Sequence, residues 1–391
     1  MTSSNKIIVA SAGSGKTEEI VNSALAVSTS ERVLMTTYTD NGAREIRERI
    51  QSKVGFIPAN IEVVTWFSVL LKHGVKPYQN DVVGVNIVRG LHFEKRLGFP
   101  KKTDIQPYFL DGSSNVYRDY LSEFALLVNE RSNGAMMERF SQIFSHFYFD
   151  EIQDISGRDF EILELLLKST VSVTLVGDPR QGTFSTTQSR TNRGQTKSHI
   201  MKWVSRLETA GLVDVEVQNH SNRCGQPICD FADALYPDHA ATESRNEVRT
   251  THDGVVFVRV ADVSAYVSAF SPQLLVWNAR SEKFGLRSRN MGEVKGLTFE
   301  RVLINPTGTI LRYMQKGDAL AEETRAKFYV AITRARQSVA IVVDKPGQSS
   351  LLYWQPPAVS VRSGDGGDRS RASSSVGASE GISIHDAEGW D

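Results

Sequence analysis

Short hydrophobic runs alternate along the first half of the chain with segments of helical periodicity. The runs are KIIVA (6–10), RVLMTT (32–37), IEVVT (61–65), HFYFD (146–150) and VSVTLVGD (171–178). Between them lie segments such as GAREIRERIQSK and RDFEILELLLK, in which apolar residues recur every three or four positions. This alternation predicts βαβ units and a parallel sheet, and therefore an α/β fold.

The alternation of apolar runs and helical segments is interrupted once and then resumes. Segment 74–143 is long, mostly helical in pattern and rich in aromatic residues, which predicts an insertion into the first α/β domain. The later runs are VDVEV (213–217), GVVFVRV (254–260), QLLVW (273–277), RVLI (301–304) and SVAIVVD (338–344), with a helix expected near 321–333. Two consecutive sheets fit this pattern better than one.

The expected organisation is therefore two α/β domains and a tail. We predict the first domain over 1–185 and the second over 186–355. Eight Ser and six Gly fall within 356–391, and this composition predicts a disordered tail.

Composition narrows the functional classes. The 391 residues contain 45 Lys and Arg against 45 Asp and Glu, so the formal net charge is zero. Any contact with nucleic acid must then come from a local surface and not from bulk charge. Two cysteines build neither a disulfide framework nor a four-cysteine zinc site, and they fit a reducing compartment. No run approaches the ~20 apolar residues of a membrane span, and no signal peptide is evident, so we expect a cytoplasmic protein.

A phosphate-binding loop is predicted at ASAGSGKT (10–17), between the first strand and a helical segment. Lys16 is expected to reach the β- and γ-phosphates of ATP, and the Thr17 hydroxyl to hold Mg²⁺. The first position of the usual GxxxxGK[ST] pattern is relaxed to Ala10, but the strand–loop–helix context argues against a plain glycine-rich turn. The loop residues expected to cradle the phosphates are Ala12, Gly13, Ser14 and Gly15.

An acidic pair closes the predicted strand HFYFD. Asp150 can hold Mg²⁺, and Glu151 can orient or deprotonate an attacking water. In LVGDPRQGTF (175–184), Gln181 is placed where its amide can sense a γ-phosphate. A solvated helix start is the plain alternative for the acidic pair, but a phosphate loop in the same chain favours the functional interpretation. For Gln181 the motif alone is a weak signal, and a plain strand-end turn would explain it.

Seven segments then occur in a fixed order: ASAGSGKT, TTYTDNGAREIRERI, DEIQD, VGDPRQ, SNRCGQPICDFADAL, VKGLTFERVLI and YVAITRAR. Together they resemble the UvrD/Rep-like branch of superfamily 1 helicases. The resemblance implies two RecA-like P-loop NTPase lobes with ATP and Mg²⁺ between them. It also implies that Arg223 and Arg334 face the γ-phosphate from the second lobe and that Gly296 lies at the nucleotide.

The same resemblance implies contacts with single-stranded DNA, which would cross both lobes. The matched positions are Thr37, Tyr38, Thr65, Trp66, Ser68, Phe184 and Lys295. Aromatic residues at such positions stack on bases, although core packing is the alternative, particularly for Trp66.

Two departures concern the nucleoside. Asn222 stands where relatives carry a tyrosine that stacks on adenine, and Thr298 where they carry a glutamate that reaches the ribose. We therefore expect poor base selectivity.

The function implied by the resemblance is an ATP-dependent DNA helicase or translocase with single-strand-stimulated hydrolysis and 3′–5′ polarity. A nucleotide-gated regulatory ATPase subunit of a nuclease complex, in DNA repair or phage defence, is the alternative. The expected partners are single-stranded DNA and, in the alternative, a nuclease or another DNA-processing protein, with no membrane.

Overall fold

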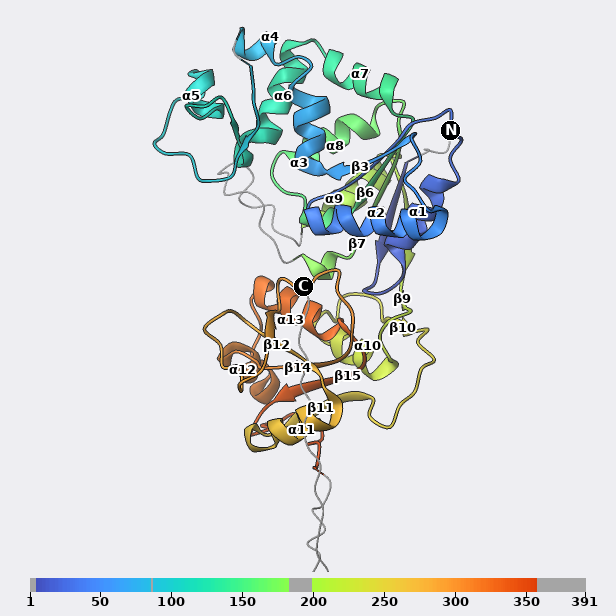
Figure 1. Cartoon of the computed structure of the whole chain (residues 1–391), viewed down its shortest axis with the longest axis vertical. Helices are drawn as coiled ribbons and strands as arrows, with labels where there is room; N and C mark the ends of the chain where they lie inside the picture. Colours follow the sequence, from blue (N-terminus) through green and yellow to red (C-terminus); the bar gives the residue numbers. More distant parts are fainter. Residues whose placement is uncertain (1–4, 86, 183–198, 357–391) are drawn as a thin grey trace, which may run out of the picture. The chain divides into compact units, whose positions relative to one another are not determined.

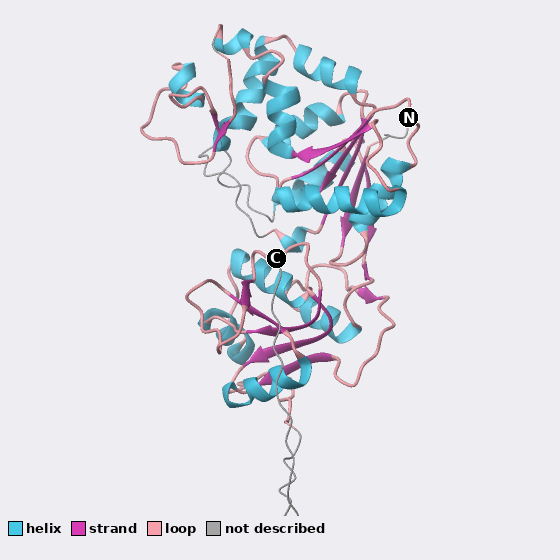
Figure 2. Ribbon diagram, in the orientation of Figure 1, coloured by secondary structure: helices cyan, strands magenta, loops and turns pink. Residues whose placement is uncertain are grey.

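The computed structural model describes residues 5–85, 87–182 and 199–356, and in these residues two large parallel β-sheets carry helices on both faces (Figures 1 and 2). This confirms the predicted α/β class. Phe184, the expected domain boundary at 185/186 and residues 357–391 lie outside the described residues. No helix within the described ranges is long and apolar enough to cross a bilayer.

The first sheet has six parallel strands in the order β3-β2-β6-β7-β1-β8. Its strands are β1 (Lys6–Ala10), β2 (Val33–Thr37), β3 (Ile61–Thr65), β6 (His146–Asp150), β7 (Ser172–Gly177) and β8 (Asp214–Gln218). Five of them coincide with the apolar runs of the first half of the sequence. The carboxyl ends of β6, β7 and β1 are therefore neighbours at one edge, where ligands of such sheets bind.

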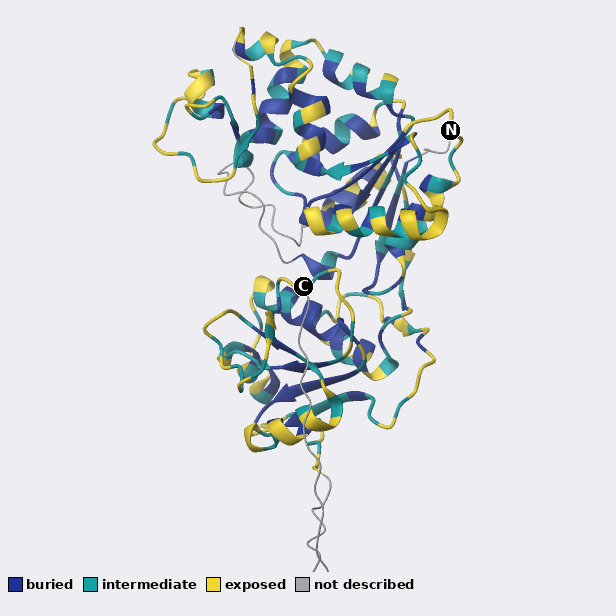
Figure 3. Cartoon of the chain, viewed as in Figure 1, coloured by how far each residue is buried: buried dark blue, intermediate teal, exposed yellow. Residues whose placement is uncertain are grey.

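Helices cover both faces of this sheet. They are α1 (Lys16–Leu25), α2 (Asp40–Val54), α3 (Trp66–Val69), α6 (Leu121–Arg131), α7 (Ala135–Ile143), α8 (Asp159–Leu167) and α9 (His199–Thr209). On one face Ile8 and Met35 pack with Ile20 of α1 and Ile46 of α2. Ile7 points to the opposite face, in a larger cluster completed by α3, α6, α8 and α9. Buried residues accordingly follow the strands and the inner sides of the helices (Figure 3).

The segment between α3 and α7 is mixed, with short helices and one short two-stranded sheet. It comprises η1 (Leu70–Val75), α4 (Asn80–Val83), β4 (Leu91–His92), α5 (Ile105–Phe109), β5 (Val116–Tyr117) and η2 (Arg118–Tyr120), followed by α6. Phe109 and Phe124 are fully buried in it and lie 4.9 Å apart between ring centroids. These aromatic rings therefore extend the hydrophobic core on one face of the first sheet.

The second sheet has five parallel strands in the order β11-β15-β14-β12-β13. Its strands are β11 (Gly254–Val258), β12 (Gln273–Val276), β13 (Ser288–Asn290), β14 (Phe299–Ile304) and β15 (Ala335–Val342), and its helices are α10 (Gln226–Asp233), α11 (Val263–Phe270), α12 (Gly308–Lys316) and α13 (Glu322–Ile332). Helix α11 packs on one face, and α10, α12 and α13 pack on the other.

One strand belongs to a different sheet from the one expected. VDVEV was predicted as part of the second sheet, but β8 pairs with β1 along its whole length, with Lys6 opposite Asp214 and Ala10 opposite Gln218. The assignment was wrong because the choice of a sheet is a non-local pairing that a short apolar run does not encode. The chain leaves the first sheet only after β8, through the short pair β9 (His220–Ser221) and β10 (Glu243–Ser244).

Candidate functional site

The phosphate loop joins β1 to α1 through two glycines in left-handed conformation. Gly13 has φ 79° and Gly15 has φ 98°, a region that residues with a side chain rarely adopt. A Cβ atom on Gly13 would lie 2.7 Å from the Cβ of Arg223, so the close approach of the second-lobe segment also requires glycine. Helix α1 begins immediately afterwards at Lys16, which points the helix N-terminus at the loop.

The acidic pair meets this loop from the end of β6. The Thr17 hydroxyl donates to Asp150 over 2.7 Å between Oγ1 and Oδ2, and Lys16 Nζ lies 3.6 Å from Glu151 Oε1. Glu151 itself is left-handed, with φ 64°, which turns its side chain away from the strand direction and toward the loop. Residues more than 130 positions apart in sequence thus form one constellation, as the motif order predicted.

Burial and neighbouring charges shift the pKa values of the two carboxyl groups in opposite directions. Burial, together with the neighbouring Glu151, raises the pKa of Asp150 to about 6. Burial would also raise the pKa of Glu151, but Lys16 and Lys295 outweigh it and hold that pKa below its usual range. Glu151 is therefore ionised at neutral pH, as a group that accepts a proton must be.

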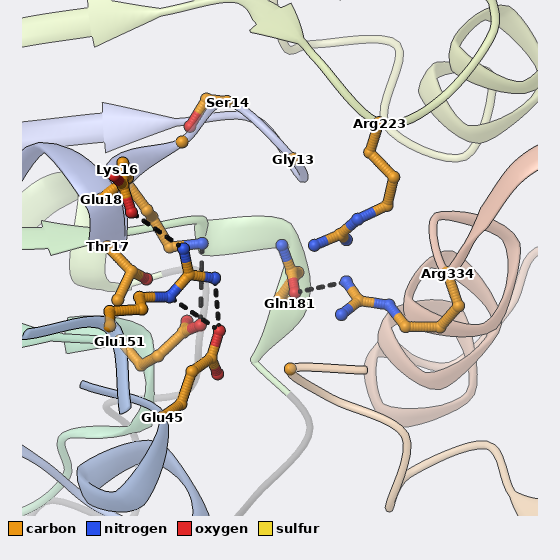
Figure 4. A pocket seen from close by; sticks show the side chains of 13 residues that line it. Gly13, Ser14, Lys16, Thr17, Glu18, Glu45, Glu151, Gln181, Arg223 and Arg334 are labelled. Atoms are coloured by element: carbon orange, nitrogen blue, oxygen red, sulfur yellow. Dashed lines mark hydrogen bonds and ion pairs between the residues drawn. The ribbon is translucent and has the colours of Figure 1, made fainter. Parts of the chain in front are cut away.

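Two arginines reach the same cavity, Arg334 from the residue before β15 of the second sheet and Arg223 from the segment between β9 and α10 (Figure 4). Arg334, fully buried between α13 and β15, donates from Nη2 to Oε1 of Gln181 over 3.1 Å. Burial and Arg223 lower the pKa of Arg334 to about 9. Arg223 is held by a hydrogen bond from Nη1 to the Thr333 carbonyl (3.1 Å). Both side chains point toward the loop, and Gly296 lines the cavity as well.

Three further residues of the cavity were not found from the sequence: Glu18, Glu45 and Arg49. Arg49 donates to Glu45 over 2.7 Å and to Glu18 over 3.2 Å. The i, i+4 spacing of Glu45 and Arg49 on α2 is a signal that the sequence offered, but it indicates only a helix-surface pair. That this pair lies beside the phosphate loop follows from the packing of α2 beside α1.

The segment around Asn222 supports the phosphate loop. Asn222 Nδ2 donates to the Ser14 carbonyl over 2.8 Å, and its backbone N–H donates to the Gly13 carbonyl over 2.8 Å. Ser221 Oγ donates to the Ala12 carbonyl over 2.7 Å. Asn222, where relatives carry a tyrosine, thus places an amide against the backbone of the phosphate loop. A tyrosine ring could not make this hydrogen bond to the Ser14 carbonyl. Thr298 is exposed and does not line the cavity.

The structure corrects the expected DNA contacts at Tyr38 and Trp66. Both rings are buried, and both donate to one carboxylate, Asp159, with Trp66 Nε1 2.9 Å from Oδ1. Ser122 of α6 donates to the same group, and burial raises the pKa of Asp159 to about 8. Core packing is therefore the role of both aromatic residues. Nothing in the sequence indicated that Asp159 binds these side chains, because its hydrogen-bond donors are spread over more than 80 residues of the chain.

Lys295 is a second correction. Its Nζ lies 2.6 Å from Asp154 Oδ2 and 3.5 Å from Glu151 Oε2, in a partly buried position beside the acidic pair. Its ammonium group is therefore paired with carboxylates of the first lobe and is not free to pair with a DNA phosphate. Of the other expected contacts, Thr37 is buried, whereas Thr65 and Ser68 lie at the start of α3 with Ser68 exposed.

These features define a P-loop NTPase with two RecA-like lobes, since one cavity combines a phosphate loop and an acidic pair with Arg334, beside a strand of the second parallel sheet, and Arg223, in the segment that leads to that sheet. A family model described as the viral superfamily 1 RNA helicase core domain matches residues 126–343, more than half of the chain, and an AAA domain model matches residues 1–186. The chain belongs to the superfamily 1 helicases.

Solved structures that are similar to the chain include a viral helicase. The chain is similar to the arterivirus nonstructural protein 10 helicase, solved in complex with DNA, at 17% sequence identity and a TM-score of 0.44. The match covers 87% of this chain and 61% of that helicase, so the chain spans less than two thirds of its length. No curated protein matches this chain.

Proposed function

We propose that the protein is an ATP-dependent motor that moves along single-stranded DNA and is stimulated by it. The observation that carries this proposal is the hydrogen bond between Arg334 and Gln181, which joins the second sheet to the catalytic edge of the first. A hydrolytic site completed from two lobes couples each turnover to their relative movement, which is the requirement for stepping along a strand.

The residues present fit Mg²⁺ bound together with a nucleotide. The Thr17 hydroxyl and Asp150 carboxylate are adjacent oxygen ligands, whereas no cluster of three or more His, Cys, Asp or Glu among the described residues offers a metal site of its own. Mg²⁺ needs further oxygen ligands, and triphosphate oxygens supply them. When bound, the ion neutralises charge on the β- and γ-phosphates.

The remaining side chains divide the work of hydrolysis. Lys16 binds the β- and γ-phosphates, and Glu151 takes a proton from the water that attacks the γ-phosphorus. The bond from that phosphorus to the bridging oxygen breaks, and ADP leaves. Arg334 and Arg223 stabilise the charge that develops on the transferred group, while Gln181 links Arg334 to this step.

The finer assignment follows the motif series. We place the chain in the UvrD/Rep-like branch with 3′–5′ movement, and we take the first lobe to end after β8, the second to follow it to residue 355, and 74–143 to be an accessory insertion. Thr65 and Ser68, at the carboxyl end of β3, are the expected strand contacts that remain accessible. The matching family model is named for RNA helicases, so stimulation of hydrolysis by RNA should be compared with stimulation by DNA.

Steady-state hydrolysis with and without single-stranded DNA or RNA tests the proposal. Lys16→Ala is expected to weaken nucleotide binding and abolish turnover. Glu151→Gln is expected to bind ATP normally but lose about 10²–10⁴ in turnover. Lys168→Ala and Glu300→Gln, both on exposed positions, are the matched controls. Stimulation by RNA alone would move the assignment to RNA, and near-normal turnover of Glu151→Gln would remove its role as base.

A further inference from the structure

Large apolar side chains are unusually exposed along residues 87–102 of the insertion, a segment that we call the arm. Among the described residues, twelve large hydrophobic side chains are exposed, and four of them fall in this stretch: Ile87, Phe93, Leu97 and Phe99. Phe93 is 63% exposed and Phe99 is 93% exposed. Exposed aromatic residues gathered in this way mark an interaction surface more often than chance.

The exposure does not come from an unstructured chain. Val88 is buried and its N–H donates to Gln79 Oε1 over 2.6 Å, and His92 lies 2.8 Å from Asp111. Further along, the Arg96 guanidinium lies over two tyrosine rings, 4.5 Å from the centroid of Tyr108 and 4.2 Å from that of Tyr120. Contacts at Val88, His92 and Arg96 therefore hold the arm, while the Phe93 and Phe99 side chains are exposed.

The arm is also basic within a chain of zero net charge. It contains Arg89, Lys95, Arg96, Lys101 and Lys102 against Glu94, a net charge of five minus one, or +4. Lys102 pairs with Glu123 over 2.5 Å. Arg89, Lys95 and Lys101 are exposed and form no ion pair within the part of the chain that the structure describes.

Aromatic and cationic residues alternate in a repeated pattern. Phe93-Glu94-Lys95 is followed six positions later by Phe99-Pro100-Lys101, so that each exposed ring has an unpaired ammonium group two residues away. Rings that stack on bases, beside cations that meet phosphates, are what sequence-independent binding of single strands requires.

We propose that the arm is a separate binding site for single-stranded nucleic acid, formed by Phe93, Phe99, Lys95 and Lys101. This inference rests on the proposed function, because it assigns a second contact to the strand on which the motor moves. None of the four residues lines the ATP cavity. The arm therefore affects the affinity for the strand and leaves hydrolysis in the absence of nucleic acid unchanged.

Equilibrium binding of fluorescent oligothymidylates to the full chain, titrated at several salt concentrations, tests the arm. Phe93→Ala and Phe99→Ala are each expected to weaken binding about fivefold or more, with no change in salt dependence. Lys95→Ala with Lys101→Ala is expected to lower the slope of log K against log salt by about 1.4, which is ~0.7 for each cation. Phe56→Ala is the matched control, because that ring is 62% exposed outside the arm, and Lys168→Ala is the control for charge.

The outcomes separate the arm from the motor itself. If DNA stimulates the wild type and the arm variants bind as tightly as the controls, the arm proposal is overturned while the proposed function stands. If the wild type hydrolyses ATP without any response to nucleic acid, the proposed function fails first. Sedimentation equilibrium provides the other decisive result: a dimer that Phe93→Ala and Phe99→Ala dissociate, with unchanged oligonucleotide binding, would assign the arm to a second copy of this chain.

Discussion

Replacing Arg334 by alanine is the sharpest perturbation of the proposed site. The side chain is fully buried and makes the direct contact with Gln181 that joins the two sheets beside the acidic pair. Its removal takes away a positive charge at the γ-phosphate position and leaves the Gln181 carbonyl oxygen without this donor. Arginines in this role contribute about 10³–10⁵ in turnover, equivalent to ~4–7 kcal/mol of transition-state stabilisation.

We therefore expect Arg334→Ala to lose at least about 10³ in kcat. ATP affinity should change much less, because Lys16 and the phosphate loop remain. Arg334→Lys is expected to recover only part of the loss, since an ammonium group does not reproduce the forked guanidinium that holds both Gln181 and the Val330 carbonyl. The assays are single-strand-stimulated hydrolysis and equilibrium binding of a fluorescent ATP analogue, with a melting curve to show that each variant is folded.

Arg336→Ala is the matched control. It lies two residues further along, its side chain is 54% exposed, and its nearest acid is Glu300 at 3.7 Å. A surface pair of this kind is worth ~0–1 kcal/mol, so turnover should be unchanged. A folded Arg334→Ala protein with turnover within about tenfold of the wild type would refute the role of this residue, because tenfold is only ~1.4 kcal/mol.

Three further predictions concern nucleotide selectivity, the buried carboxyl group of Asp159 and the pH dependence of stability at Glu62. GTP and dATP should be hydrolysed with kcat/KM within about tenfold of ATP, because the Asn222 amide is engaged with Ser14; a preference above about a thousandfold would reveal an adenine pocket. Asp159→Ala should lower the free energy of unfolding in urea by about 3 kcal/mol by leaving buried donors unpaired, with the exposed Asp214→Ala as a control that shows no such loss. A hydrogen bond from His73, with Lys72, lowers the pKa of Glu62 from 4.5 to about 2, so its stabilisation is present above pH ~4.5 and lost as pH falls through about 2. Glu62→Gln should accordingly cost about 1–2 kcal/mol at pH 7, a value reduced for solvent screening at Lys72, and a gap that does not shrink in acid would contradict this assignment.

The phosphate side of the site was predictable because it depends on local sequence and on one rule of sheet geometry. A continuous apolar run such as KIIVA has few alternatives to a buried strand, and β1 begins and ends where that run does. The carboxyl ends of parallel strands share an edge, so polar residues that follow β1, β6 and β7 must meet. Thr17 and Gln181 follow β1 and β7, and Asp150 ends β6, the neighbour of β7.

The positions that were wrong depend on partners distant in sequence. Trp66 follows a strand end, as a base-stacking residue would, but its environment is decided by Asp159, 93 residues later. Lys295 lies in a turn whose motif predicts a contact with single-stranded DNA. Its carboxylate partners, however, come from the first lobe. β8 was assigned to the wrong sheet for the same reason, since no local feature of five residues indicates which edge they join.

The arm is a proposed binding surface that no sequence motif indicates. Phe99 and Lys101 lie in none of the seven motif segments, and an aromatic residue of the insertion can equally pack in the core, as Phe109 does. Only the structure separates the two, because Phe109 is fully buried while the Phe99 side chain is exposed to solvent, three residues after Arg96, which packs on Tyr108. Recognition of phosphate by backbone amides leaves a trace in the sequence because it demands glycines at fixed spacing. Recognition by exposed side chains demands only that they be left uncovered, and that depends on the packing of the surrounding chain.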